Sequence, residues 1–241
     1  MRTQVTNDGG DDDLVLVLGW GNRLHHENVE WLVDQFVDAG YRVHTFQIPD
    51  FPRDFFAEWV RPVRTYVDEL DEYSVVGHST GGLIAAYLEG AETTTYLSPW
   101  WGYTEETPGW VLDLLARIGS RHRVIPSTVS TRESIGELAT DRQLADGADR
   151  VSSRFIRETR RGHRERPAID SDAVVFCTLR DTVVSTRAIG AAVDPRQVIL
   201  YDGGHELFSS RRRAEYADSL LAAVDGGAGA GRKAAETVDD T

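Results

Sequence analysis

Sulfur and lysine are almost absent from this sequence. Cys177 is the single cysteine among 241 residues, so no disulfide can form within one chain. It lies in the apolar run AVVFC, which indicates a small buried side chain and not a reactive thiol. Lys233 is the only lysine, and every other residue among the 26 basic ones is arginine. The fold therefore cannot depend on a disulfide, and arginine supplies nearly all of the positive charge.

Long apolar stretches are missing as well. No run of about 18 apolar residues occurs, which is the length that a membrane-spanning helix requires. Residues 1–13 are polar and lack the apolar centre of a secretory signal. We therefore expect a cytoplasmic protein with no membrane span.

The sequence has fewer basic than acidic residues. The 39 acidic and 26 basic residues give a formal net charge of -13. Nucleic acids and anionic membranes attract surplus Lys and Arg, so the composition argues against a general affinity for either. The carboxylates are spread along the chain, and with the scarcity of lysine they resemble the surfaces of proteins from halophilic archaea. A moderately acidic protein encoded by a GC-rich genome is the alternative interpretation.

Short apolar runs recur along the chain in the manner of buried strands. The runs are Leu14–Leu18, Tyr41–Phe46, Tyr73–Val76, Thr93–Leu97, Ala173–Leu179 and Gln197–Tyr201. Runs that are apolar at nearly every position suit the strands of a parallel sheet whose two faces are both covered. Helical patterns fill most of the intervals. The sequence therefore predicts an α/β fold, with a mainly parallel sheet of about six strands and helices on both faces.

One interval breaks the alternation of strands and helices. More than seventy residues separate Leu97 from Ala173, which is too long for a simple connection. We expect one α/β domain over residues 14–224, with a helical cap inserted at residues 103–167. The ends, residues 1–13 and 225–241, are rich in Gly, Asp and Ala and are expected to be flexible acidic tails.

The segment GHSTG, residues 77–81, places a serine between two glycines directly after an apolar run. One interpretation is a glycine turn in which Ser79 caps the following helix. The other is a nucleophile elbow, a sharp strand-to-helix turn that exposes the Ser79 hydroxyl above the sheet. The strand before the motif and the small residues after it provide the context that an elbow requires. His78 is expected to point away from the chemistry.

Two further residues stand where the second interpretation needs them. A serine becomes a nucleophile when a histidine takes its proton and an acid orients that histidine. Asp181 follows the run AVVFCTL, and His205 follows the run QVILY. All three residues would then lie at the carboxyl edge of the sheet. Asp202 competes for the role of the acid, but its place only three residues before His205 favours Asp181.

With these motifs the sequence resembles the α/β-hydrolase superfamily over about residues 14–224. The resemblance is to serine esterases and lysophospholipase-like members. It implies that Ser79 is the nucleophile, His205 the general base and then acid, and Asp181 the orienting carboxylate. It also implies a Ser-His-Asp mechanism through an acyl-enzyme, a small-molecule acyl substrate, and no cofactor or metal.

The resemblance extends to an oxyanion hole. In this family one donor is the backbone N–H after the nucleophile, here that of Thr80. The segment LVLGWGN, residues 16–22, resembles the family's His-Gly-x-Gly loop and makes the Trp20 amide the second donor. Leu18 stands where many relatives carry a histidine that braces this loop. A simple tight turn at Gly19 and Gly21 is the alternative.

Two other clusters bear on the substrate. Trp100 and Trp101 follow the strand after the elbow helix, where they would form part of the substrate wall or pack in the core. Six arginines lie between Arg154 and Arg166, either to recruit an anionic substrate or as a solvated helix face paired with carboxylates.

The adjacent His25, His26 and Glu27 are interpreted as surface residues and not as a metal site, because no third ligand is near in sequence. The sequence thus predicts a serine hydrolase of carboxylic esters or related acyl bonds. The alternatives are an aminopeptidase-like enzyme that uses Glu105 or Glu106, a thioesterase, and a non-catalytic ligand-binding protein on the same fold.

Overall fold

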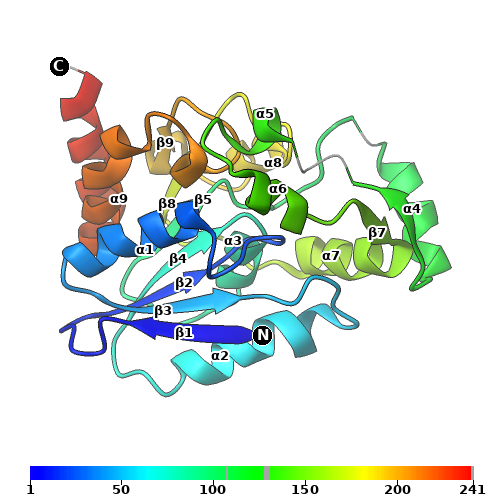
Figure 1. Cartoon of the computed structure of the whole chain (residues 1–241), viewed down its shortest axis with the longest axis horizontal. Coiled ribbons are helices and arrows are strands. Elements are labelled where there is room, and N and C mark those ends of the chain that lie inside the picture. The colour runs from blue at the N-terminus through cyan, green and yellow to red at the C-terminus, as the bar shows by residue number, and fades with distance from the viewer. Residues whose placement is uncertain (107, 128–130, 240–241) are drawn as a thin grey trace.

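A seven-stranded sheet forms the centre of the molecule. The structure is a computed structural model that describes residues 1–106, 108–127 and 131–239. The strands follow the order β1-β3-β2-β4-β5-β8-β9 across the sheet (Figure 1). Their bounds are β1 Arg2–Thr6, β2 Asp13–Val17, β3 Arg42–Gln47, β4 Ser74–His78, β5 Thr94–Leu97, β8 Val174–Cys177 and β9 Val198–Leu200.

The central strands are parallel and buried on both faces. From β3 to β9 every neighbouring pair is parallel, with Val15 beside both His44 of β3 and Val75 of β4. All residues of β4 and β8 are buried, as expected for parallel strands covered on both faces. The sequence of β8 is apolar throughout, whereas β4 combines two valines with Ser74, Gly77 and His78. The predicted mainly parallel α/β sheet is confirmed, with β1 as an additional antiparallel strand at one edge.

Helices cover both faces of the sheet, and a helical cap follows β5. The helices are α1 Glu27–Asp38, α2 Arg61–Val67, α3 Thr80–Ala85, α4 Gly109–Ile118, α5 Arg132–Ile135, α6 Asp141–Asp146, α7 Ser153–Glu165, α8 Thr186–Gly190 and α9 Ala217–Asp239. A π-helical turn, Phe56–Val60, leads directly into α2. Pro62 lies in the first turn of α2, directly after this π-helical turn, in which the Arg61 amide donates to the Phe56 carbonyl.

Two hydrophobic cores lie on opposite faces of the sheet. On one face α1 and α9 contribute side chains such as Phe36 and Leu220. On the other face α2, α3 and α7 contribute side chains such as Val63, Leu83 and Phe155. Phe36 and Leu83 are fully buried, and burial of such a side chain stabilises the fold by about 1.5–3 kcal/mol.

Both ends of the chain differ from the expected flexible tails. Arg2–Thr6 form β1, which pairs along its whole length with β3, although most of its side chains are exposed. Helix α9 continues past residue 225 to Asp239, with a break at Gly226 and Gly227 where Gly227 has a φ of 66°. The Tyr41 hydroxyl donates a hydrogen bond to Asp225, which ties this region to the core. Residues 240 and 241 lie outside the described part of the chain.

The interval between β5 and β8 holds several elements, which we call the cap. It contains α4 to α7, and it also holds a two-stranded antiparallel sheet that the predicted helical cap did not include, β6 Arg123–Pro126 and β7 Arg150–Ser152. Figure 1 shows these elements at one end and along one side of the sheet. Within the described ranges, no helix is long and apolar enough to cross a membrane.

Candidate active site

Ser79 lies in a strained turn between β4 and α3. Its backbone has φ 51° and ψ -115°, a conformation that costs energy for any residue with a Cβ. The flanking glycines allow the turn, because a Cβ on Gly81 would collide with the Val17 carbonyl and one on Gly77 would lie 2.8 Å from Gly82 Cα. The Ser79 amide donates to the Leu97 carbonyl at 2.9 Å. The sharp turn therefore has a structural cause, and it presents the hydroxyl at the carboxyl edge of the sheet.

Asp181 and His205 form a buried pair at the same edge. His205 Nδ1 lies 2.8 Å from Asp181 Oδ2, and both side chains are almost wholly excluded from solvent. The other carboxylate oxygen accepts hydrogen bonds from the amides of Val183 and Val184, at 2.8 and 3.0 Å. These contacts fix the carboxylate and orient the imidazole.

Asp202, the competing acid, lies away from His205. Its carboxylate pairs with Arg180 at 3.0 Å and with Arg212 at 3.7 Å, and its side chain is exposed to solvent. Of the two candidate acids, Asp181 is the one that contacts His205.

The Asp181 contact changes the pKa of both partners. Burial alone would lower the pKa of His205, but the charge and hydrogen bond of Asp181, with a smaller contribution from Glu206, outweigh it and raise that pKa. Burial alone would raise the pKa of Asp181, but the interaction with His205 and the two amides hold it below its ordinary value. The carboxylate therefore stays ionised, and it favours the protonated form of the imidazole.

A cavity of about 230 Å³ connects the functional side chains. Ser79 and His205 both line it, although no hydrogen bond joins their side chains within the described part of the chain. Apolar side chains from the cap form much of the wall, namely Leu112, Leu115, Ile125, Val151, Phe155 and Ile156. Among the described residues that line this cavity there is no arginine or lysine. A cavity with this lining suits a neutral ligand that places an apolar part beside Ser79.

Two backbone amides are available beside Ser79. Thr80 and Trp20 both line the cavity, and neither of their N–H groups donates a hydrogen bond among the described residues. Thr80 is the first residue of α3, where helix geometry leaves the N–H without an intrahelical acceptor. The Trp20 side chain donates to the Asp50 carbonyl at 2.6 Å, which holds its loop in place. These amides can stabilise negative charge that develops on a bound oxygen.

Comparison with protein families assigns the fold family. The model of the alpha/beta hydrolase family matches residues 14–219, which is most of the chain. The chain belongs to this family. No curated protein matches its sequence.

Solved structures of alpha/beta hydrolases resemble this one over nearly its full length. Monoacylglycerol lipase of Paleococcus ferrophilus has a TM-score of 0.70 at 17% identity, covering 91% of this chain and 96% of its own. A soluble variant of Saccharomyces cerevisiae monoglyceride lipase, bound to a substrate analogue, has a TM-score of 0.70 at 16% identity, covering 92% and 90%. An esterase from Exiguobacterium antarcticum has a TM-score of 0.63 at 14% identity, covering 93% and 95%. At these identities the likeness shows the shared fold.

The loop after β2 in this alpha/beta hydrolase, residues 18–22, is held in place by contacts that the sequence did not reveal. Leu18 is buried in the core, and Asn22 provides the bracing contacts instead. Asn22 Oδ1 lies 3.1 Å from His78 Nδ1, and Asn22 Nδ2 donates to Glu206 Oε1 at 2.8 Å. Glu206 is 4% exposed, and it also accepts hydrogen bonds from Gln143 of α6 and from Ser209, at 2.5 and 2.6 Å. One buried carboxylate thus joins the loop to the cap.

His78 lies closer to His205 and to the cavity than expected. Its ring packs against that of His205 with centroids 5.1 Å apart, and it lines the cavity. Burial, with a contribution from the charge on His205, lowers the pKa of His78 well below its ordinary value. His78 is therefore neutral, so its Nδ1–H can donate to Asn22 without repelling a protonated His205.

The structure separates the two predicted wall tryptophans. Trp100 lines the cavity and packs against Tyr103 and Phe155 of the same wall. Trp101 packs in the core, where its indole N–H donates to the Gly82 carbonyl at 3.3 Å, and it does not line the cavity. Only Trp100 is placed to touch a bound molecule.

The arginine run from Arg154 to Arg166 forms much of α7. Ion pairs join Arg157 to Glu158, Arg160 to Asp113, and Arg161 to both Asp54 and Glu165. None of these arginines lines the cavity. The interpretation of a helix face paired with carboxylates therefore fits better than recruitment of an anion to Ser79.

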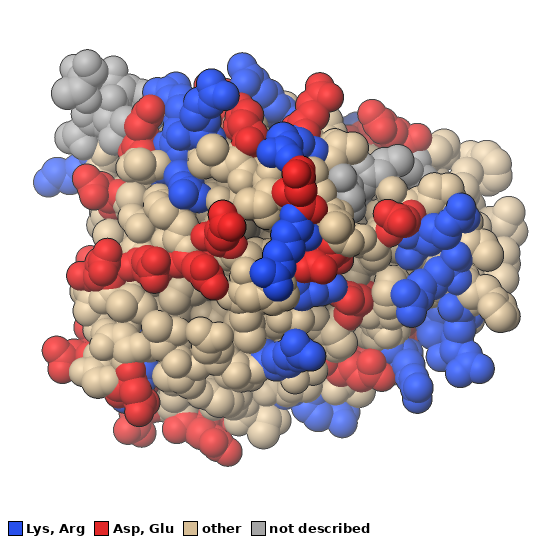
Figure 2. All heavy atoms as spheres, in the orientation of Figure 1, with Lys and Arg blue, Asp and Glu red and all other residues tan. Residues whose placement is uncertain are grey.

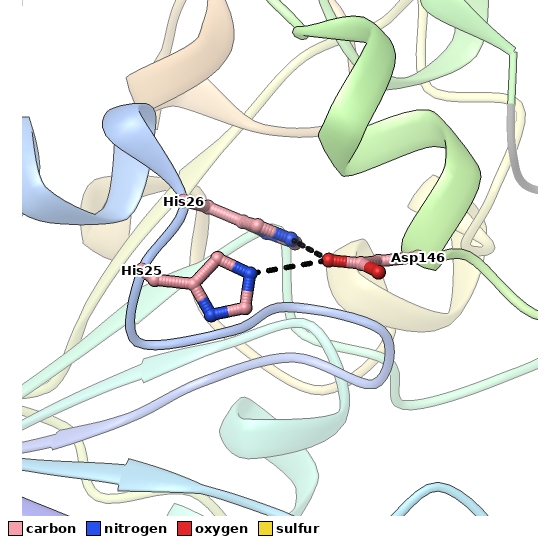
Figure 3. Close-up of side chains that lie close together, drawn as sticks. All are labelled: His25, His26 and Asp146. Carbon is pink, nitrogen blue, oxygen red and sulfur yellow. Dashed lines mark hydrogen bonds and ion pairs between the residues drawn. The ribbon is translucent and has the colours of Figure 1, made fainter.

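His25, His26 and Asp146 meet between α1 and the cap, so a third potential metal ligand does exist. Figure 3 shows both imidazoles beside the Asp146 carboxylate, with His25 Nε2 at 3.3 Å and His26 Nε2 at 3.0 Å from Oδ2. His26 Nδ1 accepts a hydrogen bond from the Arg23 amide at 3.2 Å, so a neutral His26 carries its proton on Nε2. That proton occupies the position a metal would need. The contact is a hydrogen bond between the core and the cap.

Proposed function

We propose that this alpha/beta hydrolase is a serine hydrolase that cleaves carboxylic esters through an acyl-enzyme. The observation that carries the proposal is the Asp181–His205 contact of 2.8 Å at the cavity that Ser79 also lines. The strained backbone of Ser79 adds support, because a nucleophile elbow holds its serine in such a strained turn beside the substrate cavity.

The proposed reaction has two halves. In the first, Ser79 Oγ attacks the ester carbonyl while His205 takes the hydroxyl proton, and the Thr80 and Trp20 amides stabilise the oxyanion. His205 then gives this proton to the departing alcohol, which leaves the acyl group on Ser79. In the second half, His205 takes a proton from water, and the hydroxide attacks the acyl-enzyme. The acid departs, and the proton returns to Ser79.

The proposed substrate is a neutral small-molecule ester with an apolar acyl group. The cap-derived walls and the absence of arginine and lysine from the described lining support this class. The solved structures that share the fold include two monoglyceride lipases and an esterase, which is consistent with it.

Labelling with a fluorophosphonate probe tests the nucleophile. We expect wild-type protein to be labelled and Ser79→Ala to lose labelling and hydrolysis of p-nitrophenyl esters. Ser98→Ala is the matched control, because Ser98 also follows a parallel strand with a positive φ of 41°. It is fully buried, bonds to Tyr201 and does not line the cavity. Labelling that persists in Ser79→Ala, with its circular dichroism unchanged, would remove Ser79 as the nucleophile.

A second reaction is favoured by one observation. Glu106 lines the cavity, and a carboxylate there could hold the free amine of an aminoacyl substrate. A panel of p-nitrophenyl esters, acyl thioesters and aminoacyl anilides separates these reactions. We expect esters to be cleaved fastest; faster cleavage of anilides or thioesters would assign the aminopeptidase-like or thioesterase activity. A panel with no turnover and no labelling would favour a non-catalytic binding protein.

A further inference from the structure

Helix α4 of the cap is apolar on two opposite faces. Leu112 and Leu115 face inward and line the cavity. Trp110, Leu114 and Ile118 recur at intervals of four residues, so they share another face of the helix, and they are 70%, 54% and 63% exposed. Val124, on the adjoining strand β6, is 66% exposed. The helix is therefore a thin apolar wall between the cavity and the solvent.

This apolar face is surrounded by arginine in a chain that is otherwise acidic. The four cap elements α4, β6, β7 and α7 with the turn before β6, residues 109–126 and 150–165, hold nine arginines and three carboxylates. All three carboxylates are in ion pairs with arginines of α7. Arg117, Arg121 and Arg150 are exposed and form no ion pair within the described ranges. Figure 2 shows basic side chains gathered at the end of the molecule where Figure 1 places α4.

The acidic groups concentrate at the opposite edge of the sheet. Asp11, Asp12 and Asp13 precede or begin β2 and line a hollow with Glu72, Glu92 and other carboxylates. This is the amino edge of the parallel strands, whereas Ser79 lies at the carboxyl edge. The end of the molecule that carries α4 is thus rich in arginine, whereas the hollow at the amino edge is lined by carboxylates. The net charge of -13 opposes a general affinity for anionic membranes, but it does not oppose a contact made through the arginine-rich region around α4 alone.

We propose that the outer face of α4, with Val124 and the surrounding arginines, docks on a lipid bilayer that contains anionic phospholipid. Trp110, Leu114 and Ile118 would enter the boundary of the acyl chains, and Arg117 and Arg121 would contact the lipid phosphates. The exposed apolar side chains match the acyl chains of such a bilayer, and the surrounding arginines match its anionic headgroups. A second copy of the chain docked on the same face would bring its own arginines against these, and the like charges would repel each other. A nucleic acid would pair with the arginines but leave the exposed apolar side chains without an apolar partner.

Docking would place the wall of the cavity against the source of an apolar ester. This consequence rests on the proposed function, because it assumes that the cavity receives such a substrate. The docking itself does not depend on catalysis, so it is measured with Ser79→Ala protein. Failure of the nucleophile assignment and failure of the docking proposal are thereby distinguished.

Sedimentation with lipid vesicles tests the proposal. We expect full-length Ser79→Ala protein to bind phosphatidylglycerol vesicles at low salt and to bind phosphatidylcholine vesicles more weakly. Adding Leu114→Asp and Ile118→Asp should weaken binding by about tenfold or more, because each removes a large apolar side chain from the contact. Adding Arg117→Glu and Arg121→Glu instead should abolish the preference for phosphatidylglycerol. Leu200→Asp, at an exposed apolar site on β9, is the control and should bind like its parent.

Three results would overturn the proposal. The first is a lack of binding to either vesicle. The second is equal binding by the Leu114→Asp, Ile118→Asp protein and its parent, since both substitutions are at exposed positions that the fold does not need. The third is a concentration-dependent dimer that these substitutions dissociate, which would assign this apolar face to self-association.

Discussion

At the scale of single residues, the contact between Asp181 and His205 controls the charge of the proposed general base. Its Nδ1–Oδ2 distance is 2.8 Å, and the carboxylate is what raises the pKa of an imidazole that burial would otherwise lower. His205 must be neutral to accept a proton. Activity should therefore fall as the pH drops through a pKa that lies above the ordinary value for histidine.

Asp181→Asn should reduce kcat/KM by about 10³–10⁴-fold, because the imidazole loses both its orienting partner and the negative charge that stabilises its protonated form. The acid limb of the pH profile should move to lower pH in this variant, since burial then dominates the pKa of His205. Rates of p-nitrophenyl ester hydrolysis between about pH 4 and 9 measure both effects.

Asp202→Asn is the matched control for this substitution. Asp202 precedes His205 by three residues but pairs with Arg180 and Arg212 at the surface, so its kcat/KM should stay near the wild-type value. A larger loss of activity in Asp202→Asn than in Asp181→Asn would reverse the assignment of the acid.

Some of these residues could be found from the sequence, and others could not. Ser79, Asp181 and His205 each follow an apolar run, so the strand ends alone bring them to one edge. Glu206 gave no such signal, because a glutamate next to a histidine reads as a surface residue. Its burial arises only when α6 folds over it and supplies Gln143.

At the scale of structural elements, Glu206 joins three parts of the chain. Its carboxylate accepts hydrogen bonds from Asn22 in the loop after β2, from Gln143 in the cap, and from Ser209 after β9. Glu206→Gln keeps the shape of the side chain but replaces one accepting carboxylate oxygen with an NH₂ group. That group would face hydrogen-bond donors and leave them without an acceptor. We expect the free energy of unfolding to fall by about 1–3 kcal/mol. We also expect the acid limb of the pH profile to move to lower pH, because the charge on Glu206 contributes to the raised pKa of His205.

Urea unfolding and the pH profile of ester hydrolysis measure these two effects. Glu215→Gln is the control, since Glu215 pairs with Arg212 at the exposed surface and should change neither measurement. If Glu206→Gln leaves both stability and the pH profile unchanged, the carboxylate does not hold these elements together.

The elements that the sequence failed to predict share a physical cause. Strands β1 and β6 have no fully buried side chain, and β7 is only three residues long, so their sequences lack the apolar runs that mark the central strands. The last part of α9 contains Gly226, Gly227 and several alanines, and its composition resembles a flexible tail. Backbone pairing with β3 holds β1 in place, because burial of its own side chains contributes little. Hydrophobic patterning reports burial, and these elements form with little of it.

At the scale of the whole molecule, the distribution of charge predicts how stability depends on salt. Carboxylates including Asp11, Asp12, Asp71, Glu72 and Asp225 crowd around one hollow, in a chain of net charge -13. Their mutual repulsion opposes folding and is screened as the Debye length falls from about 10 Å at 0.1 M salt to about 3 Å at 1 M. We expect the melting temperature to rise by roughly 2–8 °C over this range.

Differential scanning fluorimetry in NaCl measures this rise, and it also tests the proposed salt-adapted origin. The double substitution Asp11→Asn, Asp12→Asn removes two exposed carboxylates from the hollow. It should raise the melting temperature at low salt and reduce the gain at high salt, which separates screening of charge from a general effect of salt on apolar burial. A melting temperature that falls with added NaCl would contradict the expectation.

The cap leaves the sheet after β5 and returns at β8, and these two strands are direct neighbours. The chain therefore leaves the central sheet and returns to it at neighbouring strands. The sheet stays continuous whether the cap between them is short or long. In the proposed function, the cap supplies much of the substrate-contacting wall, while the proposed reacting groups Ser79, Asp181 and His205 lie at the edge of the central sheet. Replacing the cap at this junction would therefore alter the wall of the cavity while leaving the strand ends that hold Ser79, Asp181 and His205 in place.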